Sequence, residues 1–280
     1  MTWQTTRYRV DLTQPQVMGI VNITPDSFSD GGRHASTLAA LAHCELLLKE
    51  GADMLDLGGE SSRPGAASLP VAEEQARVLP VLKAALSLGV PVSIDTYKPE
   101  TMRAALDLGV DIVNDIYALR WPGALEAVAA HPSCGMCLMH MQGEPQSMQQ
   151  KPIYGDVLTE VSAFLAERAA VVRDAGVQDE RIVLDPGIGF GKTVEHNLAL
   201  LARQRELLAL GYPLLVGWSR KSSLGAVTGR PAGERLVASA VAALAAVQHG
   251  ARVLRVHDVE ATVDALKVWQ AAGLMRSSSI

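Results

Sequence analysis

The sequence predicts a single α/β domain over residues 1–280, of the closed (β/α)8 TIM-barrel class, with a short amino-terminal extension across the barrel bottom. Eight short aliphatic runs recur at fairly even intervals, segments with helical spacing separate them, and glycines follow those segments where helices should end. Alternation of strand and helix favours a parallel sheet, and eight repeats favour a closed barrel over an open doubly wound sheet.

The expected strands are short, almost continuously apolar and bounded by Gly, Pro, Asp or Asn, which is typical of strands buried on both faces. In chain order they span residues 17–23, 54–57, 90–94, 111–113, 136–139, 181–184, 213–216 and 252–256. The fourth is the weakest, because it is short and has polar flanks. Residues 7–15 precede the first strand and are expected to form the extension.

The expected helices are identified by apolar side chains three or four positions apart. Three clear examples lie within residues 38–49, 157–168 and 198–208. Glycines at the positions expected just beyond helix ends support the boundaries: Gly51, Gly89, Gly109, Gly176, Gly211 and Gly250.

Composition excludes several classes of protein. A chain with 48% hydrophobic and 20% charged residues can bury a large core, which excludes a disordered chain. A net charge of −5 argues against a broad nucleic-acid-binding face. The first residues lack the apolar stretch of a signal peptide, and the longest small-apolar run, residues 236–247, is far below the ~20 residues that span a bilayer. Three cysteines do not make a disulfide framework. We therefore expect a cytoplasmic protein without nucleic-acid or membrane partners.

In barrels of this class the loops after the strands carry the site. Asp95, Asn114 and Asp185 end the third, fourth and sixth strands. Carboxylates and an amide at one side of the mouth suit a ligand rich in N–H donors, such as the amino-pyrimidinone edge of a pterin or guanine. The alternative is that a strand-terminal Asp only caps the next helix. Asp115 and Asp258 are assigned mainly to such capping or loop roles.

A second group is cationic. It comprises Arg63, Arg255 and His257, with Lys221 between the two groups. Arg255 and His257 are two positions apart on a strand, so they should point to the same side. Such a group suits phosphate or diphosphate. Arg255 could instead form a surface ion pair, and Lys221 could be a solvated lysine at a helix start.

Two of the three phenylalanines, Phe28 and Phe190, fall in loops at the expected mouth. They could close over a flat ligand, although local packing within the loops is the alternative.

Two motifs suggest a phosphate-binding loop and a zinc site, but neither function is assigned. Residues 186–193 nearly match a phosphate-binding P-loop, but Pro186 replaces the first glycine and removes an N–H. Two histidines and two cysteines recur at three-residue intervals, but the last pair is about 10 Å apart along a strand, too far for one tetrahedral zinc; the set is His131, Cys134, Cys137 and His140.

Together these residues resemble the dihydropteroate synthase family of pterin-binding barrels. The matching segments are residues 18–32, 59–65, 93–96, 114–115, 139–143, 185–192, 219–222 and 255–257. They cover all eight strand ends. Position 62 is Ser where the family commonly has Thr, which retains the hydroxyl.

The resemblance implies condensation of a dihydropterin diphosphate with 4-aminobenzoate, releasing diphosphate. It also implies a bound Mg²⁺, inhibition by sulfonamides and a homodimer. By the same resemblance, the pterin-binding residues are Asp95, Asn114, Asp185, Lys221, Met139, Phe190 and Gly217. Asn22 would hold Mg²⁺.

The remaining roles implied by the resemblance lie in the loops. Diphosphate would contact Ser62, Arg63, Arg255 and His257. The aminobenzoate site would comprise Phe28, Pro64, Phe190, Lys221 and Ser222. Residues closest to the chemistry would be Asp185, Lys221, Asp95, Phe28 and Asp30.

Two alternatives stay open. A methyltetrahydrofolate:corrinoid methyltransferase is also a pterin-binding barrel, but it would not need the cationic group of Arg63, Arg255 and His257. A catalytically inactive pterin-binding paralogue is the other alternative. The presence of Asn22, Asp26, Phe28, Arg63 and Lys221 argues against such decay.

Overall fold

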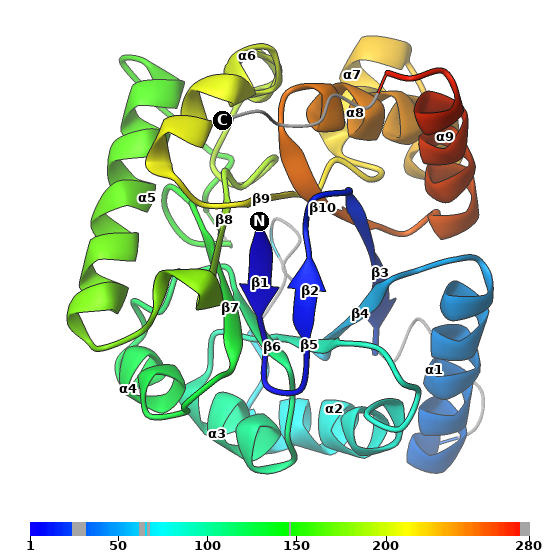
Figure 1. The fold of residues 1–280 in the computed structure, drawn as a ribbon, viewed down its shortest axis with the longest axis vertical. Coiled ribbons are helices and arrows are strands. Elements are labelled where there is room, and N and C mark those ends of the chain that lie inside the picture. Colours follow the sequence, from blue (N-terminus) through cyan, green and yellow to red (C-terminus); the bar gives the residue numbers. More distant parts are fainter. Residues whose placement is uncertain (24–31, 62–64, 66–67, 146, 275–280) are drawn as a thin grey trace.

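Eight parallel strands close into a barrel in the computed structural model, which describes residues 1–23, 32–61, 65, 68–145 and 147–274. The strand order is β10-β3-β4-β5-β6-β7-β8-β9, and every neighbouring pair is parallel. Figure 1 looks along the barrel and shows the helices as an outer ring around it. The predicted (β/α)8 barrel is confirmed.

The barrel strands agree with the predicted runs to within two residues at each end. They are β3 (Gln16–Asn22), β4 (Met54–Gly58), β5 (Val92–Asp95), β6 (Ile112–Asp115), β7 (Gly135–Met139), β8 (Ile182–Asp185), β9 (Leu214–Val216) and β10 (Ala251–Val256). The fourth run is a full member of the barrel despite its polar flanks, and it pairs with β5 and β7.

Each connection between consecutive barrel strands carries at least one helix, and a last helix follows β10. The helices are α1 (Gly32–Lys49), α2 (Val71–Ala85), α3 (Pro99–Asp107), α4 (Ala124–Ala129), α5 (Val157–Asp174), α6 (Val194–Arg203), α7 (Ser222–Thr228), α8 (Leu236–Gln248) and α9 (Val259–Ala271). Short 3-10 helices add η2 (Asp179–Arg181), η3 (Gln204–Leu210) and η4 (Ala232–Glu234). No helix among the described residues is long and apolar enough to cross a membrane.

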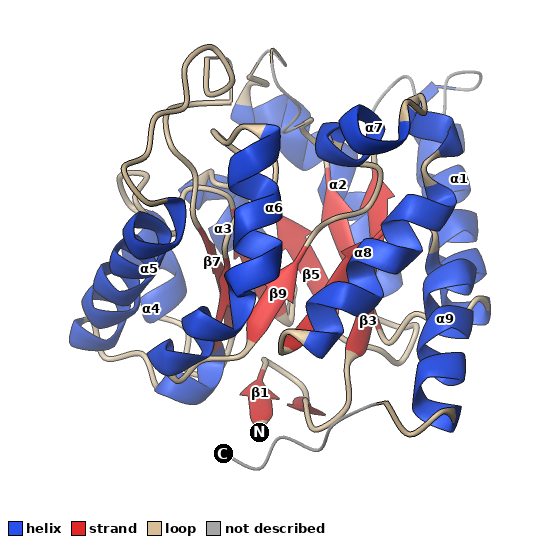
Figure 2. Cartoon of the chain, turned by 90° about the horizontal axis from the view of Figure 1, so that it is seen from above, coloured by secondary structure: helices blue, strands red, loops and turns tan. Residues whose placement is uncertain are grey.

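The amino-terminal extension is a β-hairpin that closes one end of the barrel. Its strands are β1 (Thr2–Gln4) and β2 (Arg9–Asp11), and Trp3 pairs with Val10. The extension therefore begins earlier than the predicted residues 7–15, because Trp3 is the residue that fills the barrel end. Figures 1 and 2 place the hairpin at the end of the barrel opposite α7.

Trp3 is fully buried and packs with inward-facing strand residues that include Met18, Met54 and Val253. Its indole Nε1 donates a hydrogen bond of 3.0 Å to the Arg181 carbonyl oxygen. Arg7 also fixes the hairpin, since its guanidinium pairs with the buried carboxylate of Asp111 at 2.5 Å.

Every second residue of a barrel strand faces the interior, so each strand has inward-facing side chains both at this apolar end and at the polar end of the barrel. Met54 on β4 faces the hairpin, and Asp56 follows two residues later. In the same way Val183 precedes Asp185 on β8, and Val253 precedes Arg255 on β10. One end of the interior is thus closed by packing, and the other presents charged groups.

The Trp3 side chain should contribute strongly to stability. We expect Trp3→Ala to lower the free energy of unfolding by about 3–5 kcal/mol, because it leaves a large cavity and an unpaired Arg181 carbonyl. Urea denaturation measures this, with Trp121→Ala as the control, since Trp121 is 41% exposed. Equal losses in the two variants would contradict the proposed role of the hairpin.

Candidate functional site

A buried cluster of charges lies inside the barrel at the carboxyl ends of the strands. Arg255 Nε donates to Asp56 Oδ2 at 2.6 Å, and Arg255 Nη2 donates to Asp95 Oδ2 at 2.7 Å. Asn114 Nδ2 donates to the same Asp56 oxygen at 3.1 Å. The cluster joins β10, β4, β5 and β6, and Asp56 at its centre is fully buried.

The contacts of Arg255 correct the predicted division of the site into an acidic side and a separate cationic corner. Arg255 lies within the acidic group, because a carboxylate as buried as Asp56 needs a cation nearby. His257, two residues further, has a different partner: its Nδ1 lies 3.0 Å from Ser219 Oγ. Arg255 and His257 are therefore close in sequence but have different hydrogen-bond partners.

Asp56 is not among the residues predicted from the sequence, because that prediction considered the ends of strands and Asp56 lies in the middle of β4. The signal that could have found it is a single carboxylate within the apolar run 54–57. One of its oxygens, Oδ1, is buried and receives no hydrogen bond from any residue in the described part of the chain. A donor supplied by a ligand would satisfy this acceptor.

Burial and the ion pairs shift the pKa values of Asp95 and Arg255 in opposite directions. Burial raises the pKa of Asp95 to about 7, and Arg255 opposes that shift. Burial alone would lower the pKa of Arg255, but Asp56 and Asp95 outweigh it and raise the pKa. Arg255 therefore stays charged while Asp95 titrates near neutral pH.

Asp185 and Lys221 form a second pair of charges beside the first. Asp185 Oδ1 accepts a hydrogen bond of 2.7 Å from the Gly187 N–H. Burial raises the pKa of Asp185, and the Gly187 N–H and Lys221 oppose the shift. Burial lowers the pKa of Lys221 to about 8, and Asp185 opposes it. Lys221 Nζ lies 4.2 Å from the centre of the Phe190 ring, within cation–π range.

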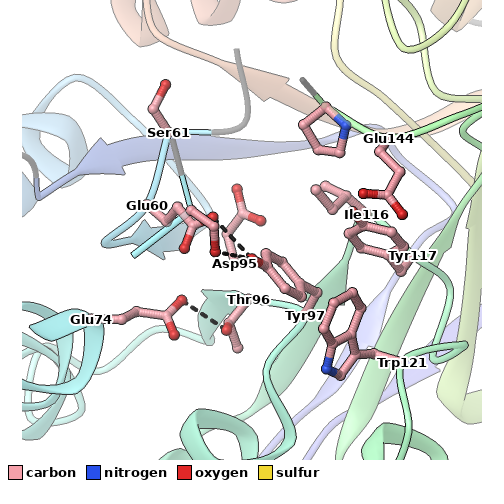
Figure 3. A pocket seen from close by; sticks show the side chains of 12 residues that line it. Glu60, Ser61, Glu74, Asp95, Thr96, Tyr97, Ile116, Tyr117, Trp121 and Glu144 are labelled. Atoms are coloured by element: carbon pink, nitrogen blue, oxygen red, sulfur yellow. Dashed lines mark hydrogen bonds between the residues drawn. The ribbon is translucent and has the colours of Figure 1, made fainter. Parts of the chain in front are cut away.

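An apolar wall completes the mouth. Met139 at the end of β7 is 4% exposed and belongs to a cluster with Ile116 and Tyr117, against which Phe190 packs. Figure 3 shows the adjoining pocket, with the carboxylates of Glu60 and Asp95 on one side and the rings of Tyr117 and Trp121 on the other. A flat ring with polar edges matches a mouth that has one apolar wall and several buried acceptors.

The remaining predicted residues lie at the rim. Asn22 is the last residue of β3 and pairs with Gly58, Gly217 follows β9, and Ser222 begins α7 with its side chain exposed. Phe28, Asp30, Ser62, Arg63 and Pro64 lie outside the described residues, as does Asp26.

Asp115 and Asp258 both lie in the capping or loop positions expected for them, but the Asp258 side chain makes no capping hydrogen bond at the start of α9. The Asp115 carboxylate accepts hydrogen bonds from the backbone N–H groups of Tyr117 and Leu119, at 2.8 and 2.7 Å. Asp258 instead pairs with Arg220 at 2.5 Å. Arg220 is thereby held away from the charged cluster, although the sequence groups it with Lys221.

The four residues with zinc-like spacing do not form one cluster in the structure. Cys134 and Cys137 are buried and free. Across the described ranges, no three His, Cys, Asp or Glu side chains gather closely enough to hold a metal ion.

Comparisons with known proteins identify one family. A family model described as pterin binding enzyme matches residues 18–257. A dihydropteroate synthase of Neisseria meningitidis serogroup B is 52% identical over 278 residues, covering 97% of this chain and 98% of the relative.

Solved structures agree in fold as well as in sequence. The dihydropteroate synthase of Burkholderia cenocepacia, complexed with 7,8-dihydropteroate, superposes with a TM-score of 0.89 at 50% identity, covering 98% of this chain and 96% of the other. The Yersinia pestis dihydropteroate synthase in a sulfonamide drug complex has a TM-score of 0.92 at 43% identity, covering 98% and 100%.

The charged cluster should make stability depend on Arg255 in a pH-dependent way. We expect Arg255→Met to lower the free energy of unfolding by about 3 kcal/mol at pH 8, because two buried carboxylates lose their cation. The loss should shrink as pH falls from 8 toward 7 and should level off below about 7, since Asp95 then holds a proton in both proteins and no longer needs the cation.

Urea denaturation at pH 8 and pH 6 measures this difference. Arg203→Met is the control, because Arg203 forms exposed ion pairs with Asp156 and Glu206. A loss for Arg255→Met that is the same at both pH values would contradict the assignment.

Proposed function

The chain belongs to the dihydropteroate synthase family of pterin-binding enzymes, and from that membership we propose how its own residues divide the reaction. The reaction joins 6-hydroxymethyl-7,8-dihydropterin diphosphate to 4-aminobenzoate and yields 7,8-dihydropteroate and diphosphate. The names of the relatives favour this transferase activity over the corrinoid methyltransferase that the sequence left open.

The pterin binds on the floor of the mouth, with its N–H donors toward Asp95, Asn114 and Asp185. The observation that carries this proposal is the convergence of buried acceptors there, including the unsatisfied Oδ1 of Asp56. An amino-pyrimidinone edge offers several adjacent N–H donors, and each would replace a hydrogen bond that water cannot supply in so buried a site. Met139 and Phe190 contact the faces of the ring, and Gly217 leaves space beside it.

The diphosphate lies toward Lys221 and His257, with Arg255 below them. Lys221 can gain or lose its proton near neutral pH, because burial lowers its pKa to about 8. Ser62 and Arg63 complete the diphosphate site in this proposal. As the resemblance implies, we assign the aminobenzoate site to Phe28, Pro64, Phe190, Lys221 and Ser222, and we assign Asp30 a role close to the chemistry.

Asn22 is the proposed ligand for Mg²⁺. The residues fit a Mg²⁺ that is shared with substrate, because Asn22 offers one amide oxygen at a strand end and Mg²⁺ in such sites takes most of its ligands from phosphate and water. When bound, the ion supplies positive charge for the diphosphate leaving group.

In the reaction, the bond from the pterin methylene carbon to the diphosphate oxygen breaks, and a bond from that carbon to the arylamine nitrogen forms. The nitrogen then loses a proton to solvent. Negative charge accumulates on the diphosphate, where Lys221, His257 and Arg255 stabilise it. Asp185 stabilises positive charge on the pterin. The arylamine is already a nucleophile, so the remaining task is to align it and exclude water.

We also propose that the protein is a cytoplasmic homodimer. Support comes from an exposed apolar face on α7 and α8, where Val227 and Val241 are each 62% exposed and Val237 is 71% exposed. Two copies related by a twofold axis would bury such a face against itself.

Asp185 and Lys221 should be essential for turnover. We expect Asp185→Asn and Lys221→Ala each to lower kcat/KM about 100-fold or more, because each removes a preorganised charge. Release of diphosphate from dihydropterin diphosphate and 4-aminobenzoate with Mg²⁺ measures the rate. Asp264→Asn and Lys267→Ala are matched controls, since these residues form an exposed pair on α9. Near-wild-type rates in the Asp185 or Lys221 variants would refute their assignment.

The dimer has a direct test. Sedimentation velocity should show a dimer for the wild-type protein and a monomer for Val237→Asp/Val241→Asp, because two charges would then lie in the interface. Val268→Asp is the control, because Val268 is 70% exposed but belongs to α9 and not to α7 or α8. A wild-type monomer, or a double variant that stays dimeric, would contradict this interface.

A further inference from the structure

Lys192, within the near-match to a P-loop at residues 186–193, has no role in the function described so far. This segment connects β8 to α6 and follows Asp185 directly. Its second-to-last residue is Lys192, at the position from which a P-loop lysine would reach a phosphate. Lys192 is instead 3% exposed and points into the protein.

The Lys192 ammonium is held by the loop itself and by His140, the residue that follows β7. Its Nζ donates to the carbonyl oxygens of Gly187 and Phe190, each at 3.0 Å, and lies 3.4 Å from the carbonyl oxygen of His140. It lies 2.9 Å from His140 Nδ1. In a P-loop, backbone N–H groups converge on an anion. In this loop, carbonyl oxygens converge on a cation that the loop carries.

His140 is fitted to accept this hydrogen bond. Burial lowers the pKa of His140 to about 3, and Lys192 adds to the shift, so the imidazole is neutral. Because Nδ1 faces the ammonium, the ring proton belongs on Nε2. The ring packs edge-on against Phe164, with the centres 4.9 Å apart.

Two glycines let the loop approach β7 and the residues after it closely enough for these contacts. Gly187 has φ +69°, and a Cβ at this position would lie 1.8 Å from the His140 carbonyl oxygen. Gly191 has φ +61°, and a Cβ there would lie 2.3 Å from the Gln142 carbonyl oxygen. The glycines of the motif therefore serve close backbone packing.

The residues that Lys192 holds are those that touch the pterin site. The N–H of Gly187 binds Asp185, and the ring of Phe190 lies against Lys221. The positive charge of Lys192 also favours the ionised form of Asp185, alongside Lys221 and Arg255. Loss of the ammonium would free both carbonyls and remove that charge.

We propose that Lys192, with His140 as its neutral acceptor, is a positioning residue that fixes the β8–α6 loop and thereby the pterin-binding geometry of Asp185, Phe190 and Lys221. This inference rests on the pterin site described under the proposed function. It assigns to Lys192 no contact with substrate.

The test is the affinity of the full chain for 6-hydroxymethyl-7,8-dihydropterin, measured by calorimetry below the unfolding temperature. We expect Lys192→Met to bind about tenfold more weakly or worse at pH 6.5, below the Lys192 pKa of about 7, because the loop no longer holds its partners in place. The pH below which binding is lost should also rise, by roughly 0.5 unit or more, because Asp185 loses a nearby positive charge.

Arg181→Met is the matched control. Arg181 is also 3% exposed and also donates to carbonyl oxygens, those of Cys134 and Val128 at 2.7 and 3.1 Å, but at the hairpin end of the barrel. It should lower the unfolding temperature without changing pterin affinity. Wild-type affinity in Lys192→Met, or losses of affinity equal to those of Arg181→Met, would overturn the proposal.

Two further variants keep the outcome unambiguous. If Lys192→Met does not fold, His140→Phe decides, because it removes the acceptor and keeps the ring: about threefold weaker binding or more supports the proposal, and unchanged binding overturns it. Asp185→Asn tests the site itself. Lost binding in Asp185→Asn with wild-type binding in Lys192→Met would refute only the role of Lys192, whereas wild-type binding in Asp185→Asn would refute the pterin site.

Discussion

The pairing of Arg255 with Asp56 and Asp95 is the interaction on which the rest of the site depends. Two carboxylates inside a barrel are costly to bury unless a cation and hydrogen bonds accompany them. Arg255 supplies both, and it joins β10 to β4 and β5. One guanidinium therefore maintains the charge of the pocket floor and holds together strands on which the ligand would rest.

The same strands contribute apolar packing residues at one end of the barrel and residues of the candidate site at the other. At one end, Trp3 and the apolar side chains around it fill the interior, and the Trp3 indole N–H donates a hydrogen bond to the Arg181 carbonyl oxygen. Two residues further along the strands, the inward positions become Asp56, Asn114 and Asp185. Since side chains alternate across a strand, each strand can contribute one residue to packing and the next inward residue to the site.

Two lysines near the sixth and seventh strand ends show how environment separates equal side chains. Lys221 lies over the Phe190 ring and beside Asp185, facing the mouth. Lys192 is turned toward carbonyl oxygens and a neutral imidazole. Burial lowers the pKa of both, to about 8 and about 7. One is placed to meet an anionic leaving group, and the other to hold the loop that shapes the pocket.

The sequence alone determined the barrel, the order of its strands and most residues at their carboxyl ends. Those features depend on local patterns: apolar runs, period-two alternation and glycines after helices. Asp95, Asn114 and Asp185 could therefore be found without coordinates, and family resemblance added the reaction.

Only the tertiary structure decided which charges meet. Arg255 reaches Asp56, 199 positions away in sequence, because barrel closure places β10 near β4. Residues 186–193 look like a phosphate site until the fold turns Lys192 inward onto His140. The hairpin begins at residue 2 because Trp3 fits the barrel end. In each case the partner lies far along the chain, and a one-dimensional pattern carries no information about which distant groups a closed sheet brings together.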